Sequence, residues 1–190
     1  MFINMQQSIK PWIVQQSTIV YAKKWMQIKE EVCELPDGQI IDPYFVIAVP
    51  DFCNVVMVTN QDELVMVEQY RHAAGIVSLE LPGGMIEPGE DPMVAAKREM
   101  EEETGYQSNH FELLYSIYPN PPLENNQAHF YLATQLTPTG KTSFDQYEDI
   151  NLVLVHKDEF LHKLLQNSFT HGAQVGAMYA AAIKLGWLKT

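Results

Sequence analysis

The chain has 190 residues, of which 46% are apolar, and its 24 acidic against 12 basic side chains give a formal net charge of −12. This length suits one full domain, or a core domain with a modest appendage, and the apolar content excludes a disordered chain. The acidic balance repels nucleic acid and anionic membranes, so we expect neither as a partner.

The two cysteines and the N-terminus indicate the compartment. Cys33 and Cys53 lie outside any CxxC or Cys/His grouping, which predicts two buried thiols. The N-terminal residues lack a basic segment followed by a long apolar run, so we expect no signal peptide. No stretch approaches the roughly 20 apolar residues of a membrane span. These features predict a cytoplasmic protein.

The first 50 residues favour strands. β-formers run from Ile13 to Val20, a second strand is predicted over Trp25–Val32, and a third over Tyr44–Val49. The turn sequence Leu35–Gly38 separates the last two. We therefore expect residues 1–50 to form an N-terminal β-rich segment and residues 51–190 to form the main domain.

The main domain contains both predicted strands and predicted helices. Six strands are expected, at Cys53–Thr59, Leu64–Tyr70, Ser78–Leu81, Phe111–Tyr118, His129–Ala133 and Ile150–Val155. Two helices are expected near the C-terminus, at Asp158–Gln166 and Gln174–Leu185. This mixture predicts an α/β or α+β layered fold.

A further helix is predicted between the third and fourth of these strands. Asp91 is a good N-cap, Pro92 suits the first helical position, and Gly105 suits the C-terminal cap. Three apolar residues with helical spacing predict the face that packs on the sheet: Met93, Ala96 and Met100.

The same helix carries three carboxylates on another face. Glu99, Glu102 and Glu103 have i, i+3 and i+4 spacing, which places them close enough to share a hard divalent cation such as Mg²⁺ or Mn²⁺. Gly83 and Gly84 lie just upstream, where the backbone can approach and add a carbonyl ligand. The alternative is a solvated acidic helix face with no ion.

The residues from Gly84 to Tyr106, GMIEPGEDPMVAAKREMEEETGY, discriminate between these alternatives. They match every fixed position of the Nudix box, GX5EX7REUXEEXGU with U apolar, and Tyr106 is the loosest fit. The chain therefore resembles the Nudix hydrolases. The resemblance implies an α/β/α sandwich with a mixed sheet, and hydrolysis of a nucleoside diphosphate linked to another group.

The resemblance also implies roles for the matching positions. Glu99 and Glu103 are similar to the principal Mg²⁺ ligands, Glu102 also belongs to the metal shell, and the Gly83 carbonyl is the backbone ligand. Mn²⁺ is the alternative ion. Structural roles in the box fall to Gly84, Glu90, Arg98 and Gly105, with Glu90 and Arg98 forming its internal ion pair.

Outside the box the chain resembles the ADP-ribose pyrophosphatase branch. The matching pieces are Glu68–Arg71, Glu80–Gly84 and the prolines Pro121 and Pro122. This resemblance implies cleavage of ADP-ribose to AMP and ribose 5-phosphate, with the N-terminal segment forming a homodimer. The alternatives are the same chemistry on another nucleotide sugar such as GDP-mannose, a non-catalytic nucleotide-binding module, and an isoprenoid diphosphate isomerase. The module would have lost a box glutamate, and the isomerase needs a catalytic cysteine near the box.

Four positions are carried over as substrate contacts. Arg71 is the candidate for holding phosphate, because its planar fork binds phosphate oxygens in pairs, and Glu80 for orienting the metal shell or substrate. Tyr21 and Trp25 are candidates for stacking on adenine. The alternatives are a surface ion pair for Arg71, an ordinary strand-end acid for Glu80, and core or dimer packing for the two aromatic residues.

The catalytic base is assigned from the loop after the box. Glu124 stands five residues past Pro119, the spacing found in ADP-ribose hydrolases, although their Ser-Pro-Gly triplet is absent here. Glu124 is therefore the first candidate for the general base. The alternatives are Glu102, and Glu148 in the acidic loop that follows.

Overall fold

The computed structural model describes residues 8–143 and 149–189. The chain divides into two compact units, one formed by Met1–Val49 with Asn120–Asn125 and the other by Pro50–Pro119 with Asn126–Thr190. None of the described helices has the length and apolar character needed to cross a membrane.

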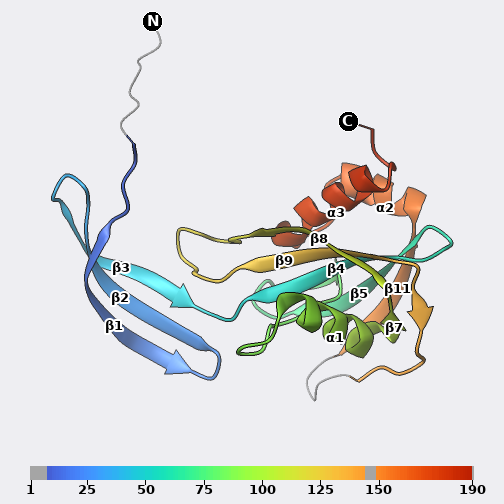
Figure 1. The fold of residues 1–190 in the computed structure, drawn as a ribbon, viewed down its shortest axis with the longest axis horizontal. Coiled ribbons are helices and arrows are strands. Elements are labelled where there is room, and N and C mark those ends of the chain that lie inside the picture. Colours follow the sequence, from blue (N-terminus) through green and yellow to red (C-terminus); the bar gives the residue numbers. More distant parts are fainter. Residues whose placement is uncertain (1–7, 144–148, 190) are drawn as a thin grey trace, which may run out of the picture. The chain divides into compact units, whose positions relative to one another are not determined.

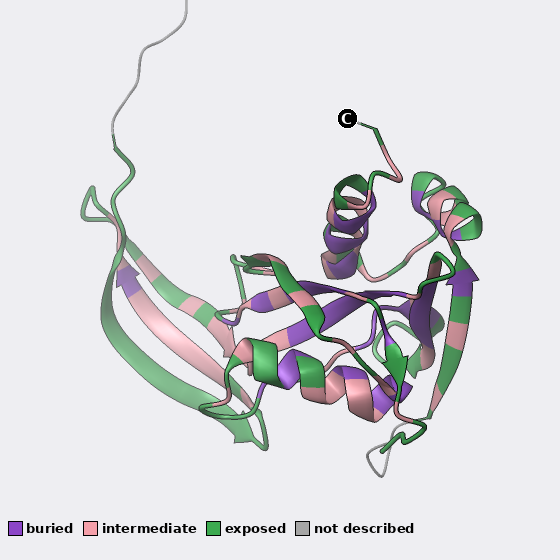
Figure 2. Ribbon diagram, turned by 45° about the vertical axis from the view of Figure 1, so that its right-hand side comes forward, coloured by how far each residue is buried: buried purple, intermediate pink, exposed green. Residues whose placement is uncertain are grey.

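The N-terminal unit is a three-stranded antiparallel sheet (Figure 1). Its strands follow one another in chain order: β1 (Ile13–Lys23), β2 (Met26–Glu34) and β3 (Ile40–Ala48). The three predicted strands are thus confirmed. β1 is exposed along its whole length, and Figure 2 shows it as a continuous green ribbon.

A short segment from later in the chain completes this unit. The Ile47 N–H donates to the carbonyl of Leu123 at 2.8 Å, and the Tyr44 hydroxyl donates to the carbonyl of Pro122 at 2.6 Å. Residues 120–125, which contain the candidate base Glu124, therefore pack against β3.

The second unit is built on a six-stranded mixed sheet with the order β11-β5-β4-β9-β8, and β6 pairs with β5. The strands are β4 (Phe52–Val58), β5 (Glu63–Arg71), β6 (Ile76–Glu80), β8 (His110–Ile117), β9 (Ala128–Thr134) and β11 (Ile150–His156). β4 and β9 run parallel, and the other pairs are antiparallel.

Helices cover both faces of this sheet (Figure 1). Helix α1 (Pro92–Thr104) packs on the face that carries Val55 and Val65. Helices α2 (Lys157–Leu165) and α3 (Gly172–Lys184) pack on the opposite face. Figure 2 shows buried residues along the sheet between them. The predicted α/β/α sandwich with a mixed sheet is confirmed.

The ends of α1 are those predicted from the sequence. The Asp91 side chain accepts hydrogen bonds from the amides of Met93 at 2.9 Å and Val94 at 3.3 Å, and Gly105 closes the helix with φ of 68°. The predicted buried face is partly wrong, because Met93 is 37% exposed and Ala95 is buried instead. The helix packs on the sheet through Ala95, Ala96 and Met100.

The sequence does not predict the two-residue strands β7 (Tyr106–Gln107) and β10 (Thr137–Pro138), which pair with each other in this unit. Two residues carry no periodic signal.

Both cysteines are buried free thiols, as expected. Cys33 lies in the N-terminal unit and Cys53 in the second unit.

Candidate functional site

The box is preceded by residues 80–84, called here the box-entry loop, which three buried polar side chains hold in place. The Asn54 amide on β4 donates to the carbonyl of Leu81 at 3.2 Å, and the Gln174 Oε1 atom on α3 accepts from the Leu81 amide at 2.8 Å. The Gly83 amide donates to Glu103 Oε2 on α1 at 2.7 Å. The loop is therefore fixed to elements on both faces of the sheet.

Two glycines in this loop are required by close contacts. Gly83 has φ of 145°, and a Cβ atom there would lie 2.0 Å from the carbonyl oxygen of Cys53. A Cβ atom on Gly84 would lie 2.7 Å from the carboxyl group of Glu99. The backbone of the loop thus lies directly against one of the predicted metal ligands.

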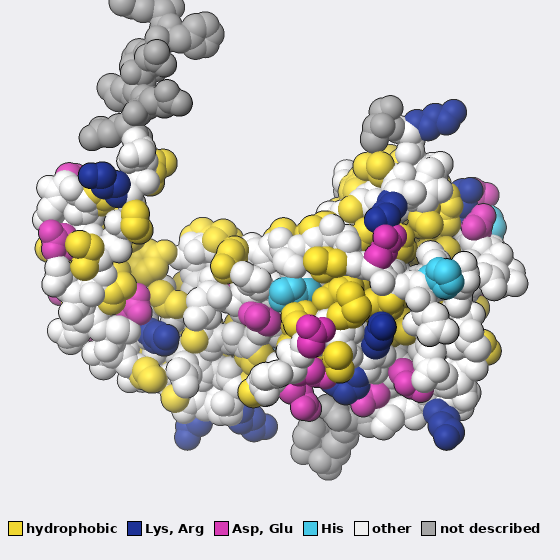
Figure 3. All heavy atoms as spheres, in the orientation of Figure 1, with side chains coloured by type: hydrophobic (Ala, Val, Ile, Leu, Met, Phe, Trp, Pro, Cys, Tyr) yellow, Lys and Arg dark blue, Asp and Glu magenta, His cyan; other side chains and the backbone are white. Residues whose placement is uncertain are grey.

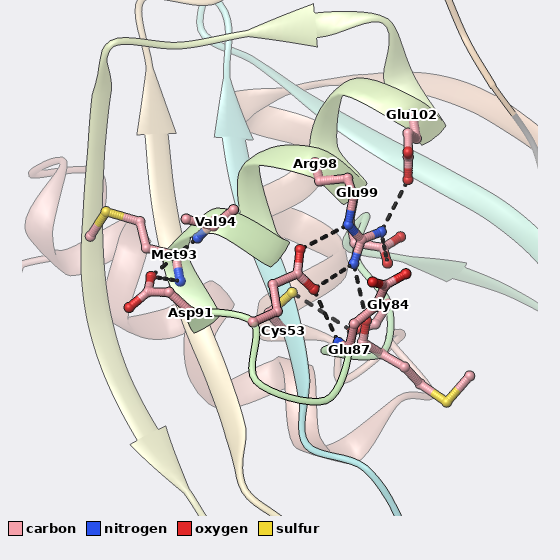
Figure 4. Close-up of polar contacts among 11 residues, drawn as sticks. Cys53, Gly84, Glu87, Asp91, Met93, Val94, Arg98, Glu99 and Glu102 are labelled. Carbon is pink, nitrogen blue, oxygen red and sulfur yellow. Dashed lines mark hydrogen bonds and ion pairs between the residues drawn. The ribbon is translucent and has the colours of Figure 1, made fainter. Parts of the chain in front are cut away.

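The Arg98 guanidinium is the centre of the box (Figure 4). Its Nε and Nη2 atoms donate to the two carboxylate oxygens of Glu90, both at 3.0 Å. Its Nη1 atom donates to Glu99 at 2.7 Å and to Glu102 at 3.1 Å, and Nη2 also donates to the carbonyl of Met85 at 3.3 Å. One cation therefore orients three of the four glutamates at the fixed positions of the box.

These contacts shift the protonation equilibria. The bidentate hydrogen bond to Glu90, followed by the contacts with Glu99 and Glu102, raises the pKa of Arg98, and the same hydrogen bond lowers the pKa of Glu90. Both groups are thus kept charged, which preserves the geometry around the neighbouring carboxylates. Figure 3 shows acidic and basic side chains adjoining over α1.

The oxygen atoms offered by the box are of the type that a hard divalent cation prefers as ligands. Glu99, Glu102 and Glu103 offer carboxylate oxygens from one helix face, and the Gly83 carbonyl accepts no hydrogen bond among the described residues. In the described part of the chain, no three acidic, His or Cys side chains are grouped as they would be around a metal ion. In this structure Glu99 and Glu102 accept hydrogen bonds from Arg98, and Glu103 accepts one from the Gly83 amide.

Arg71 and Glu80 form a second ion pair, between β5 and β6. The Arg71 Nε and Nη2 atoms donate to the two oxygens of Glu80 at 2.9 and 2.6 Å. The Glu80 side chain is buried, whereas that of Arg71 is 44% exposed. Burial alone would raise the pKa of Glu80, but the Arg71 hydrogen bonds and charge lower it overall.

The charge of Arg71 interacts with that of Glu103 in the box. The pKa of Arg71 is raised chiefly by its hydrogen bonds with Glu80, and the charge of Glu103 raises it further. Arg71 Nη1 makes no hydrogen bond among the described residues. Arg71 therefore presents a free guanidinium edge within the field of a predicted metal ligand.

The remaining predicted residues lie in the N-terminal unit or outside the described chain. Tyr21 on β1 and Trp25 in the β1–β2 turn are 43% and 54% exposed. Glu124 is partly buried and accepts a hydrogen bond from the Asn120 amide at 3.3 Å. Glu148 lies outside the described residues.

Two residues of the site have no counterpart in the sequence analysis. Asn54 and Gln174 are buried and lie 120 positions apart in the sequence, yet both hold Leu81. The only sequence signal for them is a polar residue within an otherwise apolar strand or helix face, which by itself does not identify a partner.

Two family models match this chain. The NUDIX domain matches residues 52–170, and the nucleoside diphosphate sugar hydrolase N-terminal domain matches residues 12–47. The first covers more than half of the chain and includes the whole box.

This chain is also similar to individual proteins. A methanol dehydrogenase activator from Bacillus methanolicus is 34% identical over 143 residues, which are 75% of this chain and 77% of that protein. An ADP-ribose pyrophosphatase from Bacillus subtilis (strain 168) is 28% identical over 156 residues, covering 82% of this chain and 83% of that protein. A crystal structure of an ADP compounds hydrolase matches with a TM-score of 0.82 at 20% identity, over 95% of this chain and 97% of that one, so the fold is shared.

Proposed function

The chain belongs to the Nudix family of hydrolases, and from this premise we propose that it cleaves the pyrophosphate bond of a nucleotide sugar with the help of a divalent cation. The single observation that carries the proposal is the arrangement of the box. Glu99, Glu102 and Glu103 adjoin a glycine loop, and an Arg98–Glu90 pair orients the first two.

ADP-ribose is the substrate we propose, with AMP and ribose 5-phosphate as products. The support is the Glu68–Arg71 and Glu80–Gly84 sequence, together with relatives named as ADP-ribose pyrophosphatases and an N-terminal region similar to that of nucleoside diphosphate sugar hydrolases. Another nucleotide sugar such as GDP-mannose is the second candidate, because the loop after the box lacks the Ser-Pro-Gly triplet.

The cation would be Mg²⁺, with Mn²⁺ as the alternative, held by the carboxylates of Glu99, Glu102 and Glu103 and by the Gly83 carbonyl. When bound, it would neutralise the charge of the pyrophosphate and polarise its P–O bonds. The acidic protein otherwise supplies few cations for this purpose. Arg71 is the exception, because its free edge suits a phosphate oxygen.

The reaction is the attack of a water oxygen on one phosphorus of the pyrophosphate. The bridging P–O bond breaks, one phosphate leaves with the nucleoside and the other with the sugar, and a general base accepts the proton of the water. Glu124 is the proposed base from its spacing past Pro119, and Glu102 is the alternative.

The N-terminal unit is proposed as the dimerisation and substrate-binding segment. β1 is an edge strand whose apolar side chains are exposed, including Ile19, Val20 and Tyr21. An edge strand with such residues is a template for association. Tyr21 and Trp25 are proposed to stack on the adenine.

Substitution of Glu103 tests the proposal. Glu103→Gln keeps the size of the side chain but removes the charge that would bind the cation, so kcat should fall by at least about a hundredfold. Hydrolysis of ADP-ribose with Mg²⁺, followed by chromatography of AMP, is the measurement.

Glu101→Gln is the matched control, because Glu101 lies on the same helix and accepts a hydrogen bond from the side chain of Gln107 at 2.8 Å. It should leave kcat within about twofold. If Glu103→Gln kept the activity of the wild type, the ligand assignment would be wrong.

A further inference from the structure

The first turn of α3 contacts both the box-entry loop and the Arg71–Glu80 pair through one side chain. Gln174 is 1% exposed, its Oε1 atom accepts from the Leu81 amide at 2.8 Å, and its Nε2 atom donates to Glu80 Oε2 at 3.4 Å. A buried amide is costly unless both of its ends have partners. Gln174 therefore fills a site whose two partners are adjacent in the chain.

The chemistry of these partners fixes the orientation of the amide. The backbone N–H of Leu81 can only donate, so the oxygen of Gln174 must face it. The ionised carboxylate of Glu80 can only accept, so the NH₂ group must face it. A side chain with two acceptors or with none would satisfy at most one of these contacts.

Glu80 is the junction between α3 and Arg71. Besides the two hydrogen bonds from Arg71, the neighbouring Ser78 hydroxyl and His171 help to lower the pKa of its carboxyl group. The Ser78 hydroxyl is in turn 2.9 Å from that of Thr170. The segment at the start of α3 thus reaches this one carboxylate by more than one route.

The position of Arg71 depends on that junction. Two of its three nitrogen atoms are committed to Glu80, and the third, Nη1, is the edge offered to a phosphate. A small rotation of the Glu80 carboxylate would turn the whole planar guanidinium, because both hydrogen bonds hold it as a rigid fork. The direction of the free edge is therefore set by whatever holds Glu80.

We propose that Gln174 is a positioning residue for substrate binding: anchored on Leu81, it holds Glu80 and thereby aims the guanidinium of Arg71 at the pyrophosphate of the nucleotide sugar. The inference rests on the function proposed above. Gln174 does not touch the substrate, so its loss should weaken substrate binding through Arg71 and leave the chemical step nearly intact.

The test is a double-mutant cycle in KM. Gln174→Met preserves the length and approximate volume of the side chain and removes both hydrogen bonds, so KM for ADP-ribose should rise about tenfold with kcat changed less. In an Arg71→Ala background, where the guanidinium is already absent, the same substitution should raise KM no further. A purely structural role for Gln174 would give the same proportional rise in both backgrounds.

Two more variants complete the test. Gln174→Glu keeps the shape and the acceptor for Leu81 but places an acceptor beside Glu80, so KM should rise at least as much as in Gln174→Met; it carries the test if the methionine variant does not fold. Tyr179→Phe removes a different hydrogen bond of α3, to the Leu164 carbonyl at 3.2 Å, and should leave KM unchanged.

The outcomes separate this inference from the function on which it rests. An active wild type with KM within about twofold in both Gln174 variants would overturn the positioning role alone. Additive effects of Gln174→Met and Arg71→Ala on KM would also overturn it. A wild type inactive on every nucleotide sugar would overturn the proposed function, and the positioning role with it.

Discussion

The buried carboxylate of Glu80 is paired with Arg71, whose side chain is 44% exposed. The carboxylate is buried, and its pKa is lowered below the ordinary value of 4.5 by the hydrogen bonds and charge of Arg71, against the opposing effect of burial. A carboxyl group whose pKa is lower in the folded state stabilises the fold above its unfolded pKa and loses that contribution as pH falls through the folded pKa.

This relation predicts the pH dependence of a Glu80→Gln variant. At pH 7 the variant should be less stable than the wild type by about 1–2 kcal/mol, a value reduced because Arg71 is partly exposed. The difference should begin to shrink near pH 4.5 and close at lower pH, where Glu80 becomes protonated in the wild type. Urea unfolding of both proteins between pH 7 and pH 3 measures it, and a constant difference over that range would contradict the assignment.

Gly84 is needed for the position of Glu99 rather than for backbone conformation. In Gly84→Ala the new Cβ would lie 2.7 Å from the flexible end of Glu99, which can move aside. The variant should therefore fold with stability within about 1 kcal/mol of the wild type but lose at least about tenfold in kcat, because a predicted metal ligand is displaced.

Gly172→Ala is the control for this substitution, since the Cβ it would add meets no heavy atom within 4 Å apart from its chain neighbours and the backbone of its own helix. Thermal unfolding and steady-state kinetics are the measurements. Unchanged kcat in Gly84→Ala would show that Glu99 need not stay where the structure places it.

At the residue scale, the sequence predicts the side chains that belong to a motif and misses those that support it. Glu90, Arg98 and Glu99 could be found because one helix and its preceding loop fix their spacing. Asn54 and Gln174 could not, because their hydrogen bonds to Leu81 join elements that are distant in the chain. Such contacts are set by tertiary packing, to which a single sequence gives no access.

Among the elements, α1 shows how far local rules extend. Its N-cap at Asp91 and its αL glycine at Gly105 follow from the sequence, since caps depend on a few neighbouring residues. Its buried face does not, because Met93 and Ala95 exchange roles once the helix is docked on the sheet. Periodicity predicts that a helix has a buried side, and packing decides which residues occupy it.

β1 forms as predicted, but no other element of the described chain covers its exposed residues. All of its residues are exposed, and it is an edge strand of its sheet. If this strand forms the proposed homodimer, light scattering should give twice the mass of one chain. Ile19→Lys combined with Val20→Lys should lower that mass to one chain, because both side chains are about half exposed and charges on an edge strand oppose pairing.

Ile183→Lys, at an exposed apolar position on α3, is the control and should leave the mass unchanged. A wild type with the mass of one chain at micromolar concentration would contradict the dimer. The family assignment would be unaffected by that result, because the NUDIX domain match and the box lie in residues 52–170.

For the whole molecule, the mixture of strands and helices predicted a layered α/β or α+β fold, and the resemblance of the box to that of the Nudix hydrolases implied the α/β/α sandwich. The residues that belong to each of the two units were harder to predict. Residues 120–125 belong with the N-terminal sheet although they follow the box in the chain, and they include Glu124. The segment is proline-rich, at Pro121 and Pro122, but that composition does not indicate which sheet it packs against.

We propose that this Nudix chain hydrolyses the pyrophosphate of a nucleotide sugar at the carboxylates of the box. Purified protein should be given ADP-ribose, GDP-mannose, other nucleotide sugars, NADH and diadenosine polyphosphates with Mg²⁺ or Mn²⁺, and the products resolved by chromatography. We expect AMP and ribose 5-phosphate to be released chiefly from ADP-ribose, and we expect this release to stop when EDTA removes the cation. Release chiefly from GDP-mannose would correct the substrate and leave the site intact, whereas no cleavage of any nucleotide sugar with either ion would contradict the claim.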